Sequence, residues 1–326
     1  MWFRSECLFK CALASKAQDE RPLYEIVNMS NHISVCICTY RRGELLRQLL
    51  ERLRGQRTDG LFSYSVVVSD NDYLQSAKEI VSQFTITSST PAVLYCVESE
   101  QNIALARNKA IAHAEGNFIA FIDDDEFPTE EWLWNLFTTR SAYDAAGVLG
   151  PVRPYFAYQP PDWVVKGKLF DRPTYPTGHA MDWRQSRTGN VLFKKEILDG
   201  LEEAFRPQFG TGGEDVDFFG RMTRRGCLFV WCNEAEVFEV VPQARCTRRY
   251  LLRRALLRGR ISLQRGGSRV FSIGKSLIAI SIYGLGLPIL FVLGHHHFMK
   301  YLIKLCDHAG KILAIIGLNP VKVREI

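Results

Sequence analysis

The sequence predicts an α/β fold, in which helices flank a mostly parallel sheet, followed by a basic and apolar helical region. Between residues 32 and 140, short β-branched and apolar runs alternate with segments of helical periodicity. This alternation is typical of parallel sheets with right-handed crossovers. The apolar run in Asn117–Glu126 ends in acidic residues, and no Asp or Glu occurs between Val240 and Cys306. The first feature predicts a ligand site and the second an anionic partner.

The chain has 326 residues, of which 47% are hydrophobic and 23% charged, as expected for a globular protein with a sizeable core. We expect residues 1–30 to be a poorly ordered extension, residues 31–245 to form the catalytic domain and residues 246–326 to form a C-terminal membrane-associated region. The nine cysteines have no regular spacing, which indicates free thiols in a reducing compartment.

The strands and helices of the sheet region follow from hydrophobic periodicity. Strands are predicted at residues 32–38, 64–68, 92–97, 118–122, 148–153, 188–193, 227–231 and 235–240. Helices are predicted at residues 44–54, 74–84, 103–113, 129–140 and 215–225. Pro151 would confine its strand to a sheet edge. Residues 154–186 are rich in proline and aromatic residues and are too long for a passive connection, so we expect a functional loop.

Three aspartates, Asp123, Asp124 and Asp125, follow the predicted strand at residues 118–122. In open α/β sheets, ligands bind in the crevice at the carboxyl ends of the strands. A divalent cation that also holds a diphosphate would relieve the repulsion among these carboxylates. The alternative is an acidic turn in which Asp125 caps the next helix. Asp70 follows the predicted strand at residues 64–68 and should point into the same crevice. It either accepts a hydrogen bond from the ring N–H of a uracil or is a solvated turn residue.

A second acidic pair, Glu214 and Asp215, follows a glycine-rich turn at a predicted helix start. A carboxylate there can accept the proton of an attacking hydroxyl, although acidic residues also cap helices. Arg107 lies on the helix at residues 103–113, where it either pairs with a phosphate of the ligand or forms an ordinary surface salt bridge. The sequence lacks the glycine fingerprints of dinucleotide enzymes and P-loop nucleotidases.

The C-terminal region combines a basic helix with apolar helices. Residues 240–275 carry nine arginines and one lysine, which leaves a net charge of −4 (6 − 10) for the rest of the chain. This charge predicts an anionic membrane surface as partner, whereas nucleic acid is not expected because aromatic residues that stack bases are nearly absent. Ser276–Leu293 contains 18 residues without a charge, which is the lower limit of length for a membrane-spanning helix. The alternative is a core helix packed on the catalytic domain. Residues 298–318 resemble an interfacial helix.

Six segments occur in an order and spacing that resemble family 2 glycosyltransferases, and in particular bacterial exopolysaccharide transferases of the succinoglycan type. They are ISVCICTYRR, VVVSDND, QNIALARNKAI, FIAFIDDDEFP, TGNVLF and GGEDVDFFGRM. The resemblance covers about residues 32–255 and implies an inverting enzyme with a type-A glycosyltransferase fold. It implies transfer from a nucleotide-sugar donor, UDP-linked by expectation, to a glycan or lipid-linked glycan acceptor. It also implies Mg²⁺ or Mn²⁺ as cofactor. The basic helix and the apolar tail predict attachment to the cytoplasmic face of the bacterial inner membrane, because arginines near an apolar segment favour that side.

The resemblance also implies a role for each matching residue. The nucleotide site would comprise Thr39, Tyr40, Arg41, Asp70, Arg107, Asp123 and Asp124. Asp125, with Asp123, would bind the metal. Asp215 would be the catalytic base with Glu214 near the acceptor, and Gly189 and Asn190 would shape the sugar site.

One departure from the family pattern concerns processivity. Processive members carry Gln-x-x-Arg-Trp after the base, and Gln243-Ala244-Arg245-Cys246 does not match it. The sequence therefore favours one sugar addition per encounter. Two alternatives remain at this point: a nucleotidyltransferase on a related fold, which would need a glycine-rich basic loop that Thr39–Gly43 does not supply, and a non-catalytic membrane-associated scaffold.

Overall fold

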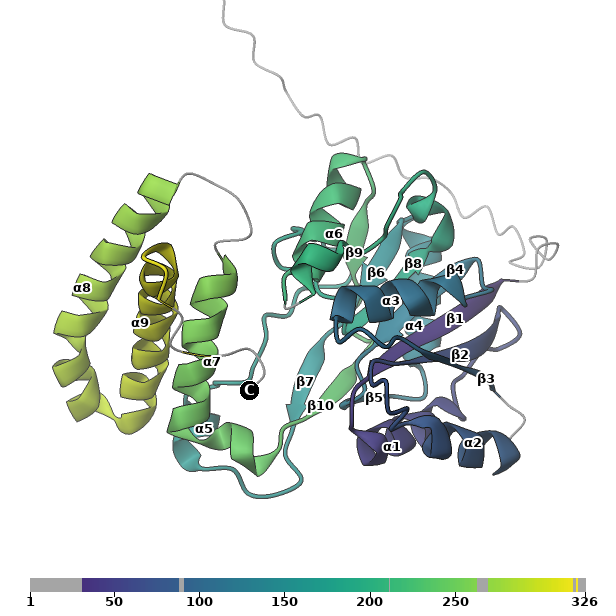
Figure 1. The fold of residues 1–326 in the computed structure, drawn as a ribbon, viewed down its shortest axis with the longest axis horizontal. Coiled ribbons are helices and arrows are strands. Elements are labelled where there is room, and N and C mark those ends of the chain that lie inside the picture. Colours follow the sequence, from purple (N-terminus) through teal and green to yellow (C-terminus); the bar gives the residue numbers. More distant parts are fainter. Residues whose placement is uncertain (1–30, 88–90, 211, 263–268, 319–320, 322–326) are drawn as a thin grey trace, which may run out of the picture. The chain divides into compact units, whose positions relative to one another are not determined.

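The computed structural model describes residues 31–87, 91–210, 212–262, 269–318 and 321 (Figure 1). The prediction for the extension at residues 1–30 lies outside these ranges. The main feature is a seven-stranded sheet with the order β3-β2-β1-β4-β8-β6-β9. A three-stranded sheet with the order β5-β10-β7 accompanies it.

The first half of the large sheet is parallel. β1 lies between β2 and β4 and pairs in parallel with both, and β2 pairs in parallel with β3. The strands are β1 (His32–Thr39), β2 (Ser63–Asp70), β3 (Ala92–Val97) and β4 (Phe118–Ile122). The connecting helices are α1 (Gly43–Leu53), α2 (Lys78–Thr87) and α3 (Ile103–Ala112). The predicted alternation of strands and helices is thus confirmed, and it brings the carboxyl ends of these strands to one edge.

The second half reverses direction. β8 (Asn190–Lys194) runs antiparallel to both β4 and β6 (Gly147–Leu149), and β9 (Phe229–Trp231) is parallel to β6. The helices are α4 (Trp132–Ala142), the short α5 (Asp162–Lys166) and α6 (Glu214–Arg224). Because β8 is antiparallel to β4, its first residues lie beside the last residues of β4: Asn190 pairs with Ile122.

The single strand predicted at residues 148–153 is wrong. The chain forms β6 in the interior of the large sheet and then β7 (Val152–Tyr155) at an edge of the small sheet. Pro151 lies between them, and without an N–H it cannot continue a ladder. The small sheet is completed by β5 (Glu126–Pro128) and β10 (Val237–Val240). Because residues 126–128 belong to β5, α4 begins at Trp132 and not at the predicted Thr129.

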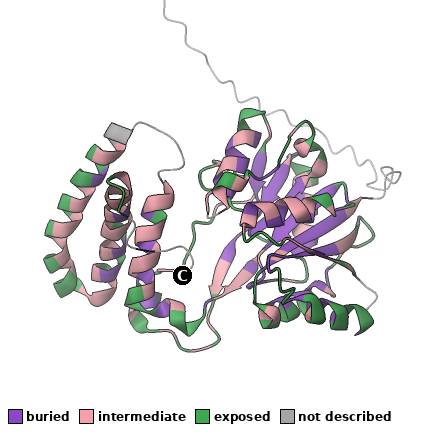
Figure 2. Cartoon of the chain, in the orientation of Figure 1, coloured by how far each residue is buried: buried purple, intermediate pink, exposed green. Residues whose placement is uncertain are grey.

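Two hydrophobic clusters cover the two faces of the large sheet (Figure 2). Alternate residues of β1 and β4 point to opposite faces: Ile33 and Val35 pack with α1 and α4, whereas Cys36 and Phe121 pack with α3 and α6. This period of two is the signature of a strand buried on both faces. Every cysteine that the structure describes is free.

Three helices follow: α7 (Arg248–Ile261), α8 (Arg269–Leu293) and α9 (His295–Ile315). α9 packs closely on α7 through two glycines. A Cβ on Gly259 would lie 2.0 Å from the Asp307 carbonyl oxygen, and one on Gly310 would lie 2.1 Å from the Leu256 carbonyl oxygen. Only glycine permits this approach, so the two helices are held in one register.

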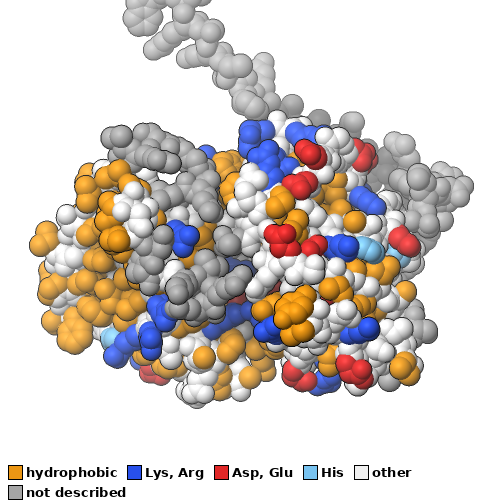
Figure 3. Space-filling view, in the orientation of Figure 1, with side chains coloured by type: hydrophobic (Ala, Val, Ile, Leu, Met, Phe, Trp, Pro, Cys, Tyr) orange, Lys and Arg blue, Asp and Glu red, His pale blue; other side chains and the backbone are white. Residues whose placement is uncertain are grey.

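Helix α8 presents a largely apolar surface, and hydrophobic side chains gather over it in Figure 3. Leu285 and Val292 are 81% and 85% exposed. Ser272–Leu293, with a mean hydropathy of 2.2, is long and apolar enough to cross a membrane. Only 6% of its most apolar window is buried, so the alternative of a buried core helix does not hold within this chain.

Candidate active site

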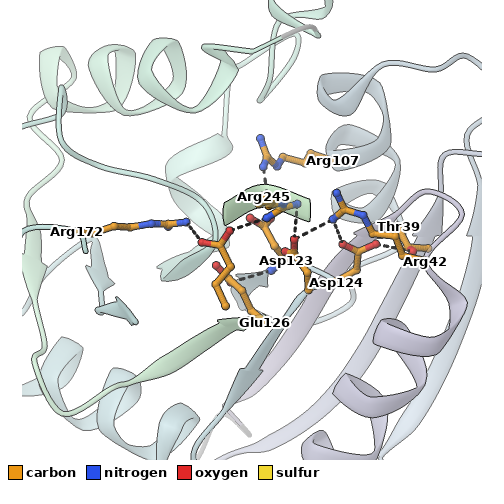
Figure 4. Close-up of polar contacts among 10 residues, drawn as sticks. Thr39, Arg42, Arg107, Asp123, Asp124, Glu126, Arg172 and Arg245 are labelled. Atoms are coloured by element: carbon orange, nitrogen blue, oxygen red, sulfur yellow. Dashed lines mark hydrogen bonds and ion pairs between the residues drawn. The ribbon is translucent and has the colours of Figure 1, made fainter. Parts of the chain in front are cut away.

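Hydroxyl and guanidinium groups hold Asp124 and Asp125, two of the three aspartates that follow β4. Figure 4 shows Asp124 beside Thr39 and Arg42. Thr39 Oγ1 donates to Asp124 Oδ2 at 2.8 Å, and Arg42 Nη1 donates to Asp124 and Asp125 at 2.8 and 3.1 Å. Arg245, which precedes α7, donates to Asp125 Oδ2 at 3.2 Å. Asp125 therefore does not cap a helix; the N-cap position of α4 is occupied by Glu131.

Burial places this carboxylate cluster under electrostatic stress. Desolvation raises the pKa of Asp124 to about 6, although Arg42 opposes the shift. Nearly half of the Asp123 side chain faces open space, yet the surrounding protein withdraws water from its carboxylate and raises its pKa. Glu126 is buried, and its Oε1 has no hydrogen-bond partner among the residues that the structure describes. Desolvation, followed by repulsion from Asp123, raises the pKa of Glu126 well above the ordinary value. The cluster would be stabilised by further positive charge.

The donor atoms in this cluster suit a hard divalent cation. Carboxylate oxygens are the ligands that Mg²⁺ and Mn²⁺ prefer. Within the described ranges, no group of three or more His, Cys, Asp or Glu side chains is arranged to hold a metal by itself.

Arg107 connects the two acidic clusters. It donates to Glu214 Oε1, and its Nη2 lies 3.8 Å from Asp123 Oδ1. Arg107 is only 7% exposed, so the interpretation as an ordinary surface salt bridge is wrong. Burial also raises the pKa of Glu214, while Arg107 opposes that shift, and Glu214 Oε2 is buried without a partner among the described residues.

Asp215 stands at the first turn of α6, after Gly213, whose φ of 99° is left-handed and favours glycine. The carboxylate is 16% exposed, and its Oδ2 lies 3.7 Å from Arg187 Nε. Asp215 Oδ1 accepts from the Val216 N–H at 2.7 Å, and the carboxylate lines a cavity.

Two adjoining cavities, each of about 470 Å³, contain these residues. The first, which we name the β8 cavity, is lined by Asp215, Gly189, Asn190, Tyr175 and Trp231, among others. The second, the β1 cavity, is lined by Thr39, Tyr40, Asp124, Asp125 and Arg245, among others. Arg107, Asp123, Arg172 and Arg254 line both. The two acidic clusters, far apart in sequence, thus meet around continuous space.

The two residues predicted to shape the sugar site both line the β8 cavity. A Cβ on Gly189 would lie 2.9 Å from Glu126 Oε1 and 3.0 Å from Asp123 Oδ2, so a side chain at this position would displace these two carboxylates. Asn190 is fully bonded: it accepts from Trp132 Nε1 and donates to the carbonyls of Pro151 and Ala235. Asn190 therefore fixes the wall of the cavity.

Two predicted nucleotide contacts lie away from the cavity walls in this conformation. Arg41 adopts a positive φ of 55° and pairs with Asp72, and its neighbour Arg42 turns into the β1 cavity instead. Asp70 is fully buried, and its oxygens accept hydrogen bonds from the N–H groups of Asp72 and Ala77 and from the Tyr95 hydroxyl. Contact of Asp70 with a base stays a prediction.

Several lining residues have no counterpart in the prediction. Arg172 and Tyr175 come from residues 154–186, where the sequence signalled a functional loop but not which side chains it delivers. Arg172 donates to Glu239 of β10. Arg245 lies in the segment where the processive signature is absent, and Arg254 lies on α7. The sequence shows that this region is rich in arginine, but it does not show that the arginine side chains converge on the carboxylates of the site.

Comparison with known proteins supplies the family. Residues 34–197, half of the chain, match Glycosyl transferase family 2. The succinoglycan biosynthesis protein ExoM of Rhizobium meliloti is 34% identical over 234 residues, which cover 71% of this chain and 74% of that protein. The chain belongs to glycosyltransferase family 2.

Other relatives and solved structures agree on the fold of this glycosyltransferase. Chondroitin synthase of Escherichia coli is 25% identical over 70% of this chain but only 37% of its own length. The mannosyltransferase PcManGT of Pyrobaculum calidifontis, solved with GDP-Man and Mn²⁺, has a TM-score of 0.54 at 19% identity and covers 91% of this chain and 78% of that one. S. aureus TarS in complex with UDP has a TM-score of 0.50 at 16% identity, and the match covers 90% of this chain and 93% of that one. At such identities the likeness shows the fold alone.

Proposed function

We propose that this glycosyltransferase moves a sugar from a nucleotide-sugar donor, UDP-linked, to a hydroxyl of a glycan or lipid-linked glycan acceptor, with inversion at the anomeric carbon. The pathway is cell-surface polysaccharide biosynthesis, as the resemblance to the succinoglycan protein suggests. The observation that carries the proposal is the meeting of Asp215 with Asp123 and Asp125 around two continuous cavities. Family membership decides against the nucleotidyltransferase alternative.

The reaction is a single displacement. Asp215 accepts the proton of the acceptor hydroxyl, and the oxygen attacks the anomeric carbon from the side opposite the diphosphate. An inverting glycosidase makes the same geometric demand of its base carboxylate. Arg107 holds Glu214 beside the base, and Gly189 lets the sugar approach the carboxylates of Asp123 and Glu126. Asp125 and Asp123 would hold Mg²⁺ or Mn²⁺, which when bound neutralises charge on the departing diphosphate.

The C-terminal helices favour attachment at the cytoplasmic face of a bacterial inner membrane. Helix α8 exposes an apolar surface, and α7 exposes Arg248, Arg249 and Arg258. Arginines beside an apolar segment favour the cytoplasmic side, where anionic lipids attract them. A lipid-linked acceptor would then be within reach of the β8 cavity.

A panel of nucleotide sugars tests the donor. Each compound is added to the full chain with Mn²⁺ or with a chelator, and the unfolding temperature is measured. A ligand at 100 times its dissociation constant stabilises the folded state by about 2.7 kcal/mol. We expect a UDP-sugar to raise the unfolding temperature only when metal is present. Stabilisation by no nucleotide sugar under either condition would contradict the proposal.

A further inference from the structure

Arg254 of α7 differs from the other arginines at the active site. Every other arginine that lines the two cavities has a carboxylate within 4 Å; these are Arg42, Arg107, Arg172, Arg184, Arg187 and Arg245. Arg254 lines both cavities, is partly buried, and has no hydrogen-bond or ion-pair partner within the part of the chain that the structure describes. A partly desolvated cation without a partner is unfavourable unless a ligand supplies the anion.

Helix α7 is fixed in place, so the position of Arg254 is part of the fold. The close glycine contacts with α9 set its register, and Arg258 makes two hydrogen bonds of 3.1 Å to Asp307. A Cβ on Gly212, in the turn that leads to Asp215, would lie 3.1 Å from Ile261 Cδ1. Tyr250, one turn before Arg254, also lines the β1 cavity.

We propose that Arg254 binds the diphosphate of the donor, and that the C-terminal helix α7 thereby completes the active site. This inference rests on the proposed function. In the transfer, the acceptor oxygen bonds to the anomeric carbon as its proton passes to Asp215. The bond from that carbon to the diphosphate oxygen breaks, and its electron pair stays on this oxygen. The Arg254 guanidinium lines both the β1 cavity and the β8 cavity, so it is placed to pair with the negative charge that develops on the departing diphosphate. Arginine can bind phosphate oxygens in a bidentate manner.

The consequence is that the C-terminal region does more than attach the enzyme to a membrane. The family match ends at residue 197, whereas Arg254 lies well beyond it on a helix packed against α9. The same bundle that carries the apolar surface of α8 therefore holds a substrate-binding group in register with Asp215.

The test compares UDP and UMP binding by calorimetry, with Mn²⁺ and the full chain, in the native protein and in Arg254→Ala. Charge-assisted hydrogen bonds contribute about 1.5–3 kcal/mol, so UDP should bind about 10- to 100-fold more weakly in the variant. UMP lacks the second phosphate, so its affinity should fall less than that of UDP when Arg254 is replaced. Arg254→Lys should recover part of the UDP affinity. Arg249→Ala removes the same charge from an exposed position of α7 and should bind UDP as the native chain does.

The outcomes separate this inference from the proposed function. If the native chain binds no UDP, the UDP-linked donor is wrong whatever Arg254 does. If the native chain and Arg254→Ala bind UDP equally, the inference is overturned. The same holds if the variant binds UDP as the native chain does and only its KM for the acceptor is raised. A lost preference for UDP over UMP in Arg254→Ala, with far-ultraviolet circular dichroism unchanged, supports it.

Discussion

The two cavities share Arg107, Asp123, Arg172 and Arg254 but differ in the rest of their walls. In the β1 cavity, the buried carboxylates of Asp124 and Asp125 and the partly buried carboxylate of Glu239 are matched by guanidinium groups. In the β8 cavity, the Tyr175 ring stacks on His179 at 4.7 Å and meets Trp231 edge-on at 5.4 Å. Charge suits a diphosphate and a cation, and aromatic faces suit the apolar face of a sugar. On the proposed function, with the donor in the β1 cavity and the acceptor in the β8 cavity, we expect that donor binding and acceptor binding can be altered separately.

The largest expected effect comes from the base. Asp215→Asn removes the proton acceptor while keeping the shape of the side chain, so turnover should fall about 10²- to 10⁴-fold. The β1 cavity is untouched, so nucleotide affinity should stay near the native value. Initial rates and calorimetry measure the two quantities. Glu202→Gln, which makes the same kind of change at an exposed position outside both cavities, serves as the control. Native turnover in Asp215→Asn would remove Asp215 from this role.

The next effect concerns the metal side. Asp125→Ala deletes a carboxylate that Arg42 and Arg245 both contact. We expect donor affinity in Mn²⁺ to fall on the order of 10²-fold, because a bound metal contributes several kcal/mol of charge stabilisation. The native protein with a chelator should bind the donor as weakly as the variant. Calorimetry checks this equality, and an affinity that still responds to Mn²⁺ in the variant would assign the metal to other ligands.

A smaller effect is expected in the aromatic wall of the β8 cavity. Tyr175→Ala removes a ring that lines the cavity and on which the apolar face of a sugar can pack, and we take this contact to contribute as much as an aromatic pair, about 0.5–1.5 kcal/mol. The KM for the acceptor should therefore rise about 2- to 12-fold with little change in donor affinity. Tyr175→Phe keeps the ring and loses only the hydroxyl bond to Gln185, so it should stay close to native. An equal rise in both KM values would mean that the cavities are not separable.

The sequence predicted the two cavities unequally. β3 and β4 begin and end at the predicted residues because a continuous apolar run between turn residues is a strong local signal. The carboxylates of the site follow from their positions at strand and helix ends. The arginines do not, since a long flexible side chain reaches its partner through tertiary packing. Arg41 and Arg42 are adjacent, and only the left-handed backbone at Arg41 decides which one enters the cavity.

The smallest expected effect tests whether arginine and metal compete for the same carboxylates. Arg42 pairs with Asp124 and Asp125, and a cation held by Asp125 must displace part of that contact. The Arg42 side chain is 42% exposed, and pairs of this kind contribute about 0.2–1 kcal/mol, so Arg42→Ala should bind Mn²⁺ about 1.4- to 5-fold more tightly without nucleotide. Arg41→Ala, which frees only Asp72, should bind Mn²⁺ as the native protein does. Calorimetry with Mn²⁺ alone decides the matter. Weaker Mn²⁺ binding in Arg42→Ala would show that the arginine organises the carboxylates for the metal, and the β1 cavity would then be preformed for a cation by the same groups that neutralise it.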